Sequence, residues 1–379
     1  MQTIAEELRS SGIPEENIVF INLDKRGYKS IRTPDGLEET IDRMCAAKGI
    51  KYLFIDEIQN VEGFEEVINA FREEEEYSIF ITGSNSYLLS GELITKLTGR
   101  YIEFEMFPLT FEEYIGMKRF LKIAVDDNEE AEFDKYIVEG GFPRTLSLPD
   151  PEEKRTYVKG VISEIFQKDI RKRVKIRNVS VFNTVQTYIL NNFGATTSLT
   201  NILNDLHKNG SDITRETLNR YIQVLIDAKI IHKCERFDLK SRRSISGEQK
   251  YYLADLGFYF ATNTDNRINY GPVLENIVYI YAKSKGYEVS VGRIGKLECD
   301  FIIRKSFAEY SYIQVAMTIL NSIETENREY NPLESVRDNY PKYVLTRDRL
   351  IQKRNGIIHA NISSFMINGS DFNSLSIIF

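Results

Sequence analysis

The stretch KYLFIDEIQN, residues 51–60, decides how the first part of this chain folds. It is a short apolar run of strand length that ends abruptly in two carboxylates, Asp56 and Glu57. At the end of a buried strand, Asp56 can hold Mg²⁺ or its water shell, and Glu57 can orient and deprotonate an attacking water. The pattern therefore indicates a nucleotide-hydrolysing site, and an exposed loop with a solvated acid pair is the alternative.

Strand-like and helix-like segments alternate on both sides of this stretch. The apolar runs are NIVFINLD, YLFIDE, SIFITGS and YIEFEMF, and a helical pattern, FEEVINAFREEEE, lies between two of them. Strands that alternate with helices form parallel sheets covered by those helices. The sequence therefore predicts an α/β fold with a parallel sheet for the first part of the chain.

Polar residues also follow the next predicted strand. Thr82, Ser84 and Asn85 come directly after SIFI, so their side chains would reach the same edge of the sheet as Asp56, near a γ-phosphate. Arg100, in LTGRY, is a candidate for stabilising transition-state charge in the manner of an arginine finger. Two successive strands with the expected polar ends favour the functional interpretation over the exposed loop.

The rest of the chain changes character twice. Residues 116–177 are mostly helical, with one break at GGFP. Residues 178–262 are predicted to form three helices followed by two strands, KCERFDL and QKYYLAD. This order is typical of a winged helix. Thr214 is the predicted cap of the third helix. Residues 271–379 form another α/β unit that begins with the helix PVLENIVYIYAKSKG and continues through strands at YEVSVGR, CDFIIRK, YSYIQVAM and KYVLTR.

Composition limits the classes of function. The 379 residues carry a formal net charge of −7, which does not suit indiscriminate coating of nucleic acid but leaves room for local basic patches. Residues 168–177 carry +5, and residues 229–250 carry +4. No run approaches the roughly 18 apolar residues that span a bilayer. Three isolated cysteines fit reduced thiols, so we expect a cytoplasmic protein with no membrane partner.

These motifs, in this order, resemble a family of prokaryotic AAA-superfamily ATPases. The resemblance is carried by YLFIDEIQN, ITGSNSYLLS, LTGRYIEF, PLTFEEY and GGFP, and later by LENIVY, ECDFI and YIQVA, so that it covers essentially the whole chain. It implies an AAA-type nucleotide-binding domain over residues 1–115, a helical lid or linker over 116–177, a winged helix over 178–262 and a restriction-endonuclease-like domain over 271–379. It further implies ATP and Mg²⁺ as cofactors.

The resemblance also implies a role for each matching residue of the first domain. Asp56 and Glu57 take the Walker B positions, with Asp56 as the Mg²⁺ ligand. Asn85 takes the sensor position, and Arg100 is the candidate catalytic arginine. Thr82 and Ser84 would lie beside the bound nucleotide.

One essential part of such a site is missing from the sequence. The phosphate loop requires G-x-x-x-x-G-K-[ST], so that backbone N–H groups and a lysine surround the phosphates. The Gly295-Lys296 pair fails the pattern, because Ser290 and Leu297 stand where a glycine and a hydroxyl are required. In the family the loop precedes a helix whose tail we identify in IAEELRSSG. We therefore expect a shortened AAA domain, from a misassigned start or a degenerate relative, with ATP hydrolysis lost. Whether this chain still binds ATP and Mg²⁺ or has no cofactor stays open.

The winged helix supplies candidates for contacts with nucleic acid. A recognition helix and a basic wing would use five cationic side chains on phosphates: Arg215, Arg220, Arg242, Arg243 and Lys250. The alternative is a winged helix that serves as a protein-packing module, with solvated basic residues. DNA, protein partners and self-association therefore all stay open as partners.

The C-terminal unit contains the outline of a nuclease site. The resemblance places Glu275, Asp300 and Gln314 at the positions that hold Mg²⁺ in restriction-endonuclease-like domains, but Ala316 stands where the catalytic lysine is required. Such a set favours an inactive remnant. Three hypotheses follow: an AAA-type ATPase by ancestry, a non-enzymatic DNA- or protein-binding module, and a metal-dependent nuclease.

Overall fold

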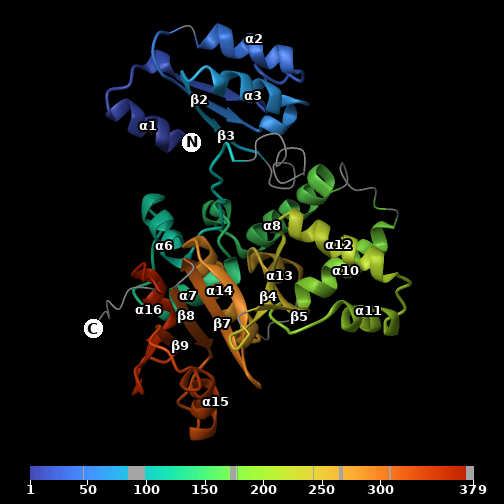
Figure 1. The fold of residues 1–379 in the computed structure, drawn as a ribbon, viewed down its shortest axis with the longest axis vertical. Helices are drawn as coiled ribbons and strands as arrows, with labels where there is room; N and C mark the ends of the chain where they lie inside the picture. Colours follow the sequence, from blue (N-terminus) through green and yellow to red (C-terminus); the bar gives the residue numbers. More distant parts are fainter. Residues whose placement is uncertain are drawn as a thin grey trace. The chain divides into compact units, whose positions relative to one another are not determined.

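The computed structural model describes residues 1–45, 47–83, 99–170, 176, 178–241, 243–263, 268–306 and 309–372. The chain divides into two compact units, Met1–Phe104 and Glu105–Phe379 (Figure 1). Each unit has its own sheet, as expected for a chain of this length.

The first unit is built on a parallel sheet of three strands. The strands are β1 (Ile18–Asn22), β2 (Lys51–Asp56) and β3 (Tyr77–Ile81), in the order β1-β2-β3. The register pairs Asn22 with Asp56 and Ile55 with Ile81, so the carboxyl ends of the strands meet at one edge. The predicted parallel sheet, with β2 ending at Asp56, is confirmed.

Helices cover both faces of this sheet. The helices are α1 (Gln2–Ser10), α2 (Pro34–Met44) and α3 (Phe64–Glu73), with short 3₁₀ turns at Glu15–Asn17 and Ile58–Asn60. Side chains alternate between the faces along each strand. Leu53 and Ile55 pack with α2 and α3 in one buried cluster, whereas Phe54 packs with α1 in another. The result is a helix–sheet–helix sandwich.

One predicted strand is absent. The run YIEFEMF, residues 101–107, has no strand hydrogen bonds, and Ile102, Phe104 and Met106 are exposed. The prediction was wrong because apolar alternation only makes a segment suitable for a strand. A strand forms when a neighbouring chain takes its N–H and C=O groups. Among the residues described, β3 is the last strand on that side of the sheet.

The second unit combines helices with a mixed sheet of eight strands. In chain order its helices are α6 (Phe111–Phe120), α7 (Glu129–Glu139), η3 (Pro143–Ser147), α8 (Pro151–Ile165), η4 (Phe166–Ile170), α10 (Val179–Asn191), α11 (Leu199–Lys208), α12 (Arg215–Asp227), α13 (Gly257–Thr262), α14 (Tyr270–Ser284), α15 (Ile323–Glu334) and α16 (Ile362–Ile367). Its strands are β4 (Ile231–Asp238), β5 (Arg243–Leu253), β6 (Glu288–Ile294), β7 (Leu297–Ser306), β8 (Glu309–Val315), β9 (Lys342–Thr346), β10 (Lys353–Arg354) and β11 (Ile357–Asn361). No helix in the described ranges is long and apolar enough to cross a membrane.

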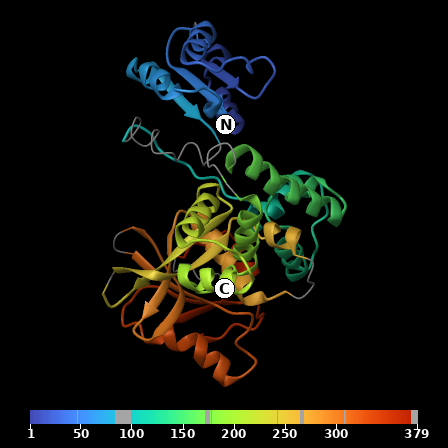
Figure 2. The same ribbon diagram turned by 90° about the vertical axis from the view of Figure 1, so that its right-hand side faces the viewer.

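The sheet runs without interruption in the order β10-β11-β9-β8-β7-β6-β4-β5. The β4–β5 hairpin therefore continues the C-terminal sheet, because β4 pairs in parallel with β6 (Figure 2). Val278 of α14 and Phe301 of β7 lie in one buried cluster, whereas Leu333 of α15 and Tyr312 of β8 lie in another. The two helices thus cover opposite faces of the central strands.

Local signals placed most of these helices correctly. Thr214 caps α12 by accepting a hydrogen bond from the Thr217 N–H, as predicted. The helix α15 begins at Ile323, because the Ser322 side chain caps it by accepting a hydrogen bond from the Thr325 N–H. The three helices α10, α11 and α12 precede the β4–β5 hairpin in the predicted order, and their interpretation as a winged helix stays a prediction.

The GGFP break, residues 140–143, contacts the segment that follows β5 and so connects the α6–α8 helices with the sheet of the second unit. Asp255 is buried and accepts hydrogen bonds from the Gly141 N–H at 2.7 Å and the Gly257 N–H at 2.6 Å. A Cβ at Gly140 would lie 2.0 Å from Asp255 Oδ1, and Gly140 has a φ of 75°. Only glycine allows this approach, so the break is a packing feature of the second unit.

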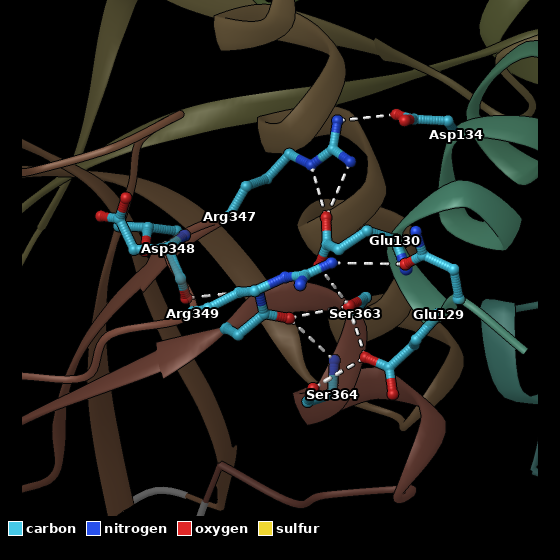
Figure 3. Close-up of polar contacts among 11 residues, drawn as sticks. Glu129, Glu130, Asp134, Arg347, Asp348, Arg349, Ser363 and Ser364 are labelled. Carbon is cyan, nitrogen blue, oxygen red and sulfur yellow. Dashed lines mark hydrogen bonds and ion pairs between the residues drawn. The ribbon is translucent and has the colours of Figure 1, made fainter.

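A polar network fastens α7 to the C-terminal strands. Arg347, at the end of β9, donates two hydrogen bonds to Glu130 Oε2 and one to Asp134 Oδ1, with N···O distances of 2.7–2.9 Å. The Ser363 hydroxyl at the start of α16 lies within hydrogen-bond distance of two carboxylate oxygens, at 2.5 Å from Glu129 Oε1 and 2.8 Å from Glu130 Oε1 (Figure 3). Because these bonds link residues more than two hundred positions apart, α7 packs as part of the second unit.

Candidate functional site

The carboxyl edge of the first sheet gathers the residues of the predicted nucleotide site. Asp56 ends β2 and lies between the ends of β1 and β3. The Asn22 side chain donates to Asp56 Oδ2 at 2.6 Å, and the Thr82 hydroxyl donates to Asp56 Oδ1. Uncharged groups from both neighbouring strands therefore orient the carboxylate. Asp56 itself is only half-buried, as a Mg²⁺ ligand would need to be.

Glu57 leaves the strand in an unusual conformation. It has a φ of 59°, in the left-handed region that non-glycine residues rarely adopt. Its backbone N–H faces the Thr82 hydroxyl at 3.4 Å, and its carboxylate accepts a hydrogen bond from Gln59. The turn places Glu57 next to Asp56 at the sheet edge. Backbone outliers of this kind concentrate at functional sites.

The structure describes only some of the remaining residues that were predicted for this site. Ser84 and Asn85 lie outside the described residues. Arg100 is described and exposed. The carboxylate pair fits a Mg²⁺–water shell, but the sequence holds no G-x-x-x-x-G-K-[ST] loop to hold phosphates beside it. If ATP and Mg²⁺ were bound, Asp56 would hold the metal and Glu57 would orient the water.

A second acidic cluster lies in the second unit. It joins two of the predicted nuclease residues, Glu275 of α14 and Asp300 of β7, to a third acid, Glu298. At its centre is Lys250 of β5, whose Nζ lies 2.9 Å from Glu275 Oε2, 3.5 Å from Glu298 Oε1 and 4.0 Å from Asp300 Oδ1. Lys250 was expected on an exposed wing. The structure corrects this, because the side chain is buried against carboxylates and cannot reach a phosphate backbone.

Gln314 extends this cluster toward α15. Its Oε1 accepts from the Asp300 backbone N–H at 3.3 Å, and its Nε2 donates to Glu329 Oε2 at 2.9 Å. The structure therefore brings Glu275, Asp300 and Gln314 into one region, as the resemblance implied. Ala316 contributes no amine. The lysine that reaches the cluster, Lys250, comes from the β4–β5 hairpin.

Electrostatics in this cluster reflect its burial. Burial, followed by the charge of Glu275, raises the pKa of Asp300 well above its usual range. Burial alone would lower the pKa of Lys250, but the charges of Glu275 and Asp300 outweigh it and raise that pKa above its usual value. Lys250 therefore stays an ammonium ion and offsets the negative charge of Glu275 in this interior.

Within the described residues, no group of three or more His, Cys, Asp or Glu side chains is placed to hold a metal ion. Cys45, Cys234 and Cys299 are buried free thiols. Burial raises the pKa of Cys45 to about 11, so this thiol is protonated and unreactive at neutral pH.

The basic residues predicted to contact nucleic acid are distributed over two elements. Arg215 and Arg220 are exposed on α12, and Arg243 is exposed where β5 begins. Arg242 lies outside the described residues. Sequence reasoning missed Arg293 and Lys296, which are exposed in the β6–β7 hairpin. No local pattern revealed them, because only the pairing of β4 with β6 brings the two hairpins together.

Sequence reasoning also missed Asn22 and Glu298. Asn22 was detectable as a polar residue at the end of the apolar run IVFIN, the same signal that identified Asp56. Glu298 and Asp300 are two positions apart on a strand, and this spacing places side chains on one face.

Two family models match parts of the chain. Residues 1–115 match an AAA domain, and residues 130–267 match a domain of unknown function, DUF8612. The chain is 33% identical over 342 residues to an uncharacterized protein of Haemophilus influenzae. The aligned residues cover 89% of this chain and 83% of that protein. It is 31% identical over 278 residues to an uncharacterized protein of Methanocaldococcus jannaschii, which covers 72% of this chain and 62% of that one.

Two solved structures share a weaker likeness. A Walker-type ATPase of Pyrococcus abyssi matches with a TM-score of 0.44 and 16% identity, over 64% of this chain and 83% of that chain. The Orc1 protein of Aeropyrum pernix, solved in complex with DNA, matches with a TM-score of 0.32 and 12% identity, over 70% of this chain and 81% of that chain. The likeness to an AAA domain therefore rests on the family model that matches residues 1–115 and not on these structures.

Proposed function

We propose that this chain, which belongs to the same protein family as the uncharacterized Haemophilus influenzae protein, is an AAA-type protein whose Walker B acids are Asp56 and Glu57. The position of Asp56 carries the proposal. It ends a buried parallel strand and is held by Asn22 and Thr82 from the strands on either side. This is the support that a Mg²⁺-binding carboxylate needs.

Residues 1–379 do not hydrolyse ATP by themselves under this proposal. The charge on a γ-phosphate must be neutralised in the transition state, and loop amides and a loop lysine supply most of that neutralisation. Glu57 can activate a water only if the phosphate is held in line beside it. Arg100, an exposed cation, contributes on the order of 1 kcal/mol or less and cannot hold the phosphate.

The test is nucleotide binding and turnover by the purified 1–379 chain. We expect no rise in Tm with Mg²⁺–ATP and no phosphate release above that of a matched Glu57→Gln variant. Turnover that Glu57→Gln abolishes would show that these residues rebuild a phosphate site. A Tm rise that Asp56→Asn removes would show that binding survives without hydrolysis.

The second candidate function is binding of DNA phosphates, and one observation favours it. β4 pairs in parallel with β6, with Asp238 beside Arg293 and the Leu239 N–H donating to Arg293 O at 3.0 Å. The hairpin tips that follow these strands therefore lie at the same end of the sheet. They place four exposed cationic residues along one edge: Lys240, Arg243, Arg293 and Lys296.

This edge suits phosphates better than base edges, because long cationic side chains contact the backbone without reading sequence. We expect binding to a duplex to weaken steeply as salt rises. Charge reversal at Arg293 and Lys296 should lower affinity by roughly tenfold and reduce the salt slope by about one for each lost phosphate contact.

Fluorescence anisotropy with a labelled duplex at several KCl concentrations measures both effects. The matched control is Lys208→Glu, which reverses an exposed lysine on α11. Equal losses in the control and in the paired variant would indicate only a general charge effect. No binding at low salt would remove DNA from the proposal.

A further inference from the structure

We propose that the ammonium of Lys250 is the resident cation of the Glu275–Glu298–Asp300 cluster and occupies the place that a divalent metal ion takes in a nuclease site. The β4–β5 hairpin would then supply, from its own strand, the positive charge that closes this cluster. Removal of Lys250 would open it to metal. This inference is independent of the nucleotide site.

The first support is the position of the ammonium group. Lys250 Nζ lies within 2.9–4.0 Å of oxygens from Glu275, Glu298 and Asp300, three acids on α14 and β7. A magnesium ion needs oxygen ligands at about 2.0–2.1 Å in a near-octahedral shell. The ammonium group occupies the space among these carboxylates instead. Lys250 is only 5% exposed, so water does not compete with the carboxylates for its ammonium group.

The second support is that the neighbouring oxygens already have donors. The Tyr252 hydroxyl donates to Glu275 Oε2 at 2.8 Å, the same oxygen that accepts from Lys250. The Val315 N–H donates to Asp300 Oδ2 at 2.8 Å. Gln314 uses its amide oxygen on the Asp300 N–H and its nitrogen on Glu329. These bonds hold the acids around the ammonium group of Lys250. The ammonium group, and not the bonds themselves, takes the place of the Mg²⁺ that a restriction-endonuclease-like site implies.

The third support is the route by which Lys250 reaches the cluster. Lys250 and Tyr252 are two positions apart on β5, so both point to one side of the strand, and both bond Glu275. Arg236, on the paired strand β4, also bonds Glu298. The hairpin thus brings two cations to the acids of α14 and β7. Removing Lys250 leaves the Glu275 carboxylate without its cation, whereas Glu298, the partner of Arg236, is partly exposed and keeps access to water.

The experiment is thermal unfolding of the full chain with and without millimolar Mn²⁺, for the wild type and for Lys250→Met. We expect the wild-type Tm to be unchanged by Mn²⁺. Lys250→Met should unfold at a Tm on the order of 10 °C lower. Mn²⁺ should restore part of that loss, because the freed carboxylates can then bind it. The restoration should vanish in Lys250→Met with Asp300→Asn.

Two controls separate this result from a general effect. Lys208→Met removes an exposed lysine that pairs with Asp205 on α11, and its Tm should match the wild type with or without Mn²⁺. Lys250→Arg keeps the charge and should show no response to Mn²⁺. If Lys250→Met does not fold, the wild type still decides the matter: a Tm rise with Mn²⁺ that Asp300→Asn abolishes would overturn the proposal. A folded Lys250→Met variant without any response to Mn²⁺ would overturn it as well.

Discussion

Asp56 in the first unit and Glu275 in the second are both carboxylates beside a sheet, but different donors hold them. Asp56 accepts hydrogen bonds from an amide and a hydroxyl at a sheet edge, and it stays partly exposed. Glu275 accepts from an ammonium group and a phenol, and Lys250 beside it is buried. Under the two proposals, the Asp56 carboxylate would take an added Mg²⁺, whereas the Lys250 ammonium group already serves as the cation beside Glu275.

The difference shows how similar residue types can serve opposite purposes. A carboxylate intended for an added cation needs uncharged support and access to solvent. A carboxylate that carries a built-in counter-ion contributes to cohesion, and removing one partner of the pair is costly. The fold of each unit, more than the acids themselves, decides which purpose is served.

The largest effect should come from breaking the enclosed cluster. Glu275→Ala leaves Lys250 buried without its nearest carboxylate, so we expect the free energy of unfolding of the second unit to fall by about 3–5 kcal/mol. The matched change in the first unit, Asp56→Ala, removes two hydrogen bonds at a partly exposed edge and should cost about 1–2 kcal/mol.

Urea unfolding followed by hydrogen exchange of peptides from β2, β5 and β7 separates the two units. An exposed pair in the second unit supplies the control, since Glu288→Ala breaks a surface contact with Arg304 and should change stability by less than about 1 kcal/mol. Equal losses for Glu275→Ala and Asp56→Ala would remove the distinction between the two sites.

The next effect concerns a buried carboxylate with backbone donors only. Burial raises the pKa of Asp255 to about 7, from 3.8 in the unfolded chain, although the Gly141 and Gly257 N–H groups oppose the shift. The folded state therefore binds a proton that the unfolded state has released between about pH 4 and 7. This stabilising contribution is complete below pH 4 and is lost as pH rises to about 7, up to about 4 kcal/mol.

Asp255→Asn removes this titration. We therefore expect the stability of the wild type relative to Asp255→Asn to fall as pH rises from 5 to 7, measured by urea unfolding across that range. Asp238→Asn is the control, because hydrogen bonds to Ser241 lower the pKa of Asp238 and its titration lies below this window. A wild-type difference that stays flat from pH 5 to 7 would show that Asp255 remains ionised in the folded protein.

A third, smaller effect tests whether α7 belongs to the second unit. Arg347→Met removes the bonds to Glu130 and Asp134 and should cost about 2–3 kcal/mol, since hydrogen bonds to charged groups are the stronger ones. Hydrogen exchange should rise in peptides of α7 and α16 together. Arg349→Met, which removes one exposed contact to Asn128, is the matched control and should leave both peptides protected.

Much of the first unit could be predicted from the sequence, because its signals are local. The apolar run of β2 and its acidic end are contiguous, and the following strand has the same form. The prediction of a strand at residues 101–107 was wrong because strand formation does not depend on local signals alone. Its apolar alternation is local, but a strand also needs a neighbour, and no local pattern supplies one.

The enclosed cluster was harder to predict. Lys250 lies in a basic segment, and a run of positive residues ordinarily predicts a solvated surface. Its burial depends on β4 pairing with β6 and on α14 covering the same region, contacts between distant parts of the chain. Glu275 and Asp300 were identified through the resemblance alone. Their counter-ion, Lys250, lies on β5, a strand that the sequence predicted to be part of a basic wing that contacts nucleic acid.

The smallest effect would sharpen the description of the open site. Asn22→Ala removes one hydrogen bond to Asp56 Oδ2 and also the Asx contacts from Asn22 Oδ1 to the backbone N–H groups of Asp24 and Lys25. We expect the free energy of unfolding to fall by about 1 kcal/mol, because the site is partly exposed and water can replace the amide.

The effect on hydrogen exchange at the end of β2 should be clearer than this small effect on stability. Without Asn22, Asp56 keeps the Thr82 hydroxyl as its one side-chain donor among the residues that the structure describes, so exchange in the peptide that follows β2 should rise while β3 stays protected. Glu39→Ala, which truncates an exposed side chain on α2, is the comparison variant. Unchanged exchange at the end of β2 would mean that Asp56 is oriented without Asn22, and the carboxylate that we propose for the Walker B position would then depend on one neighbouring strand instead of two.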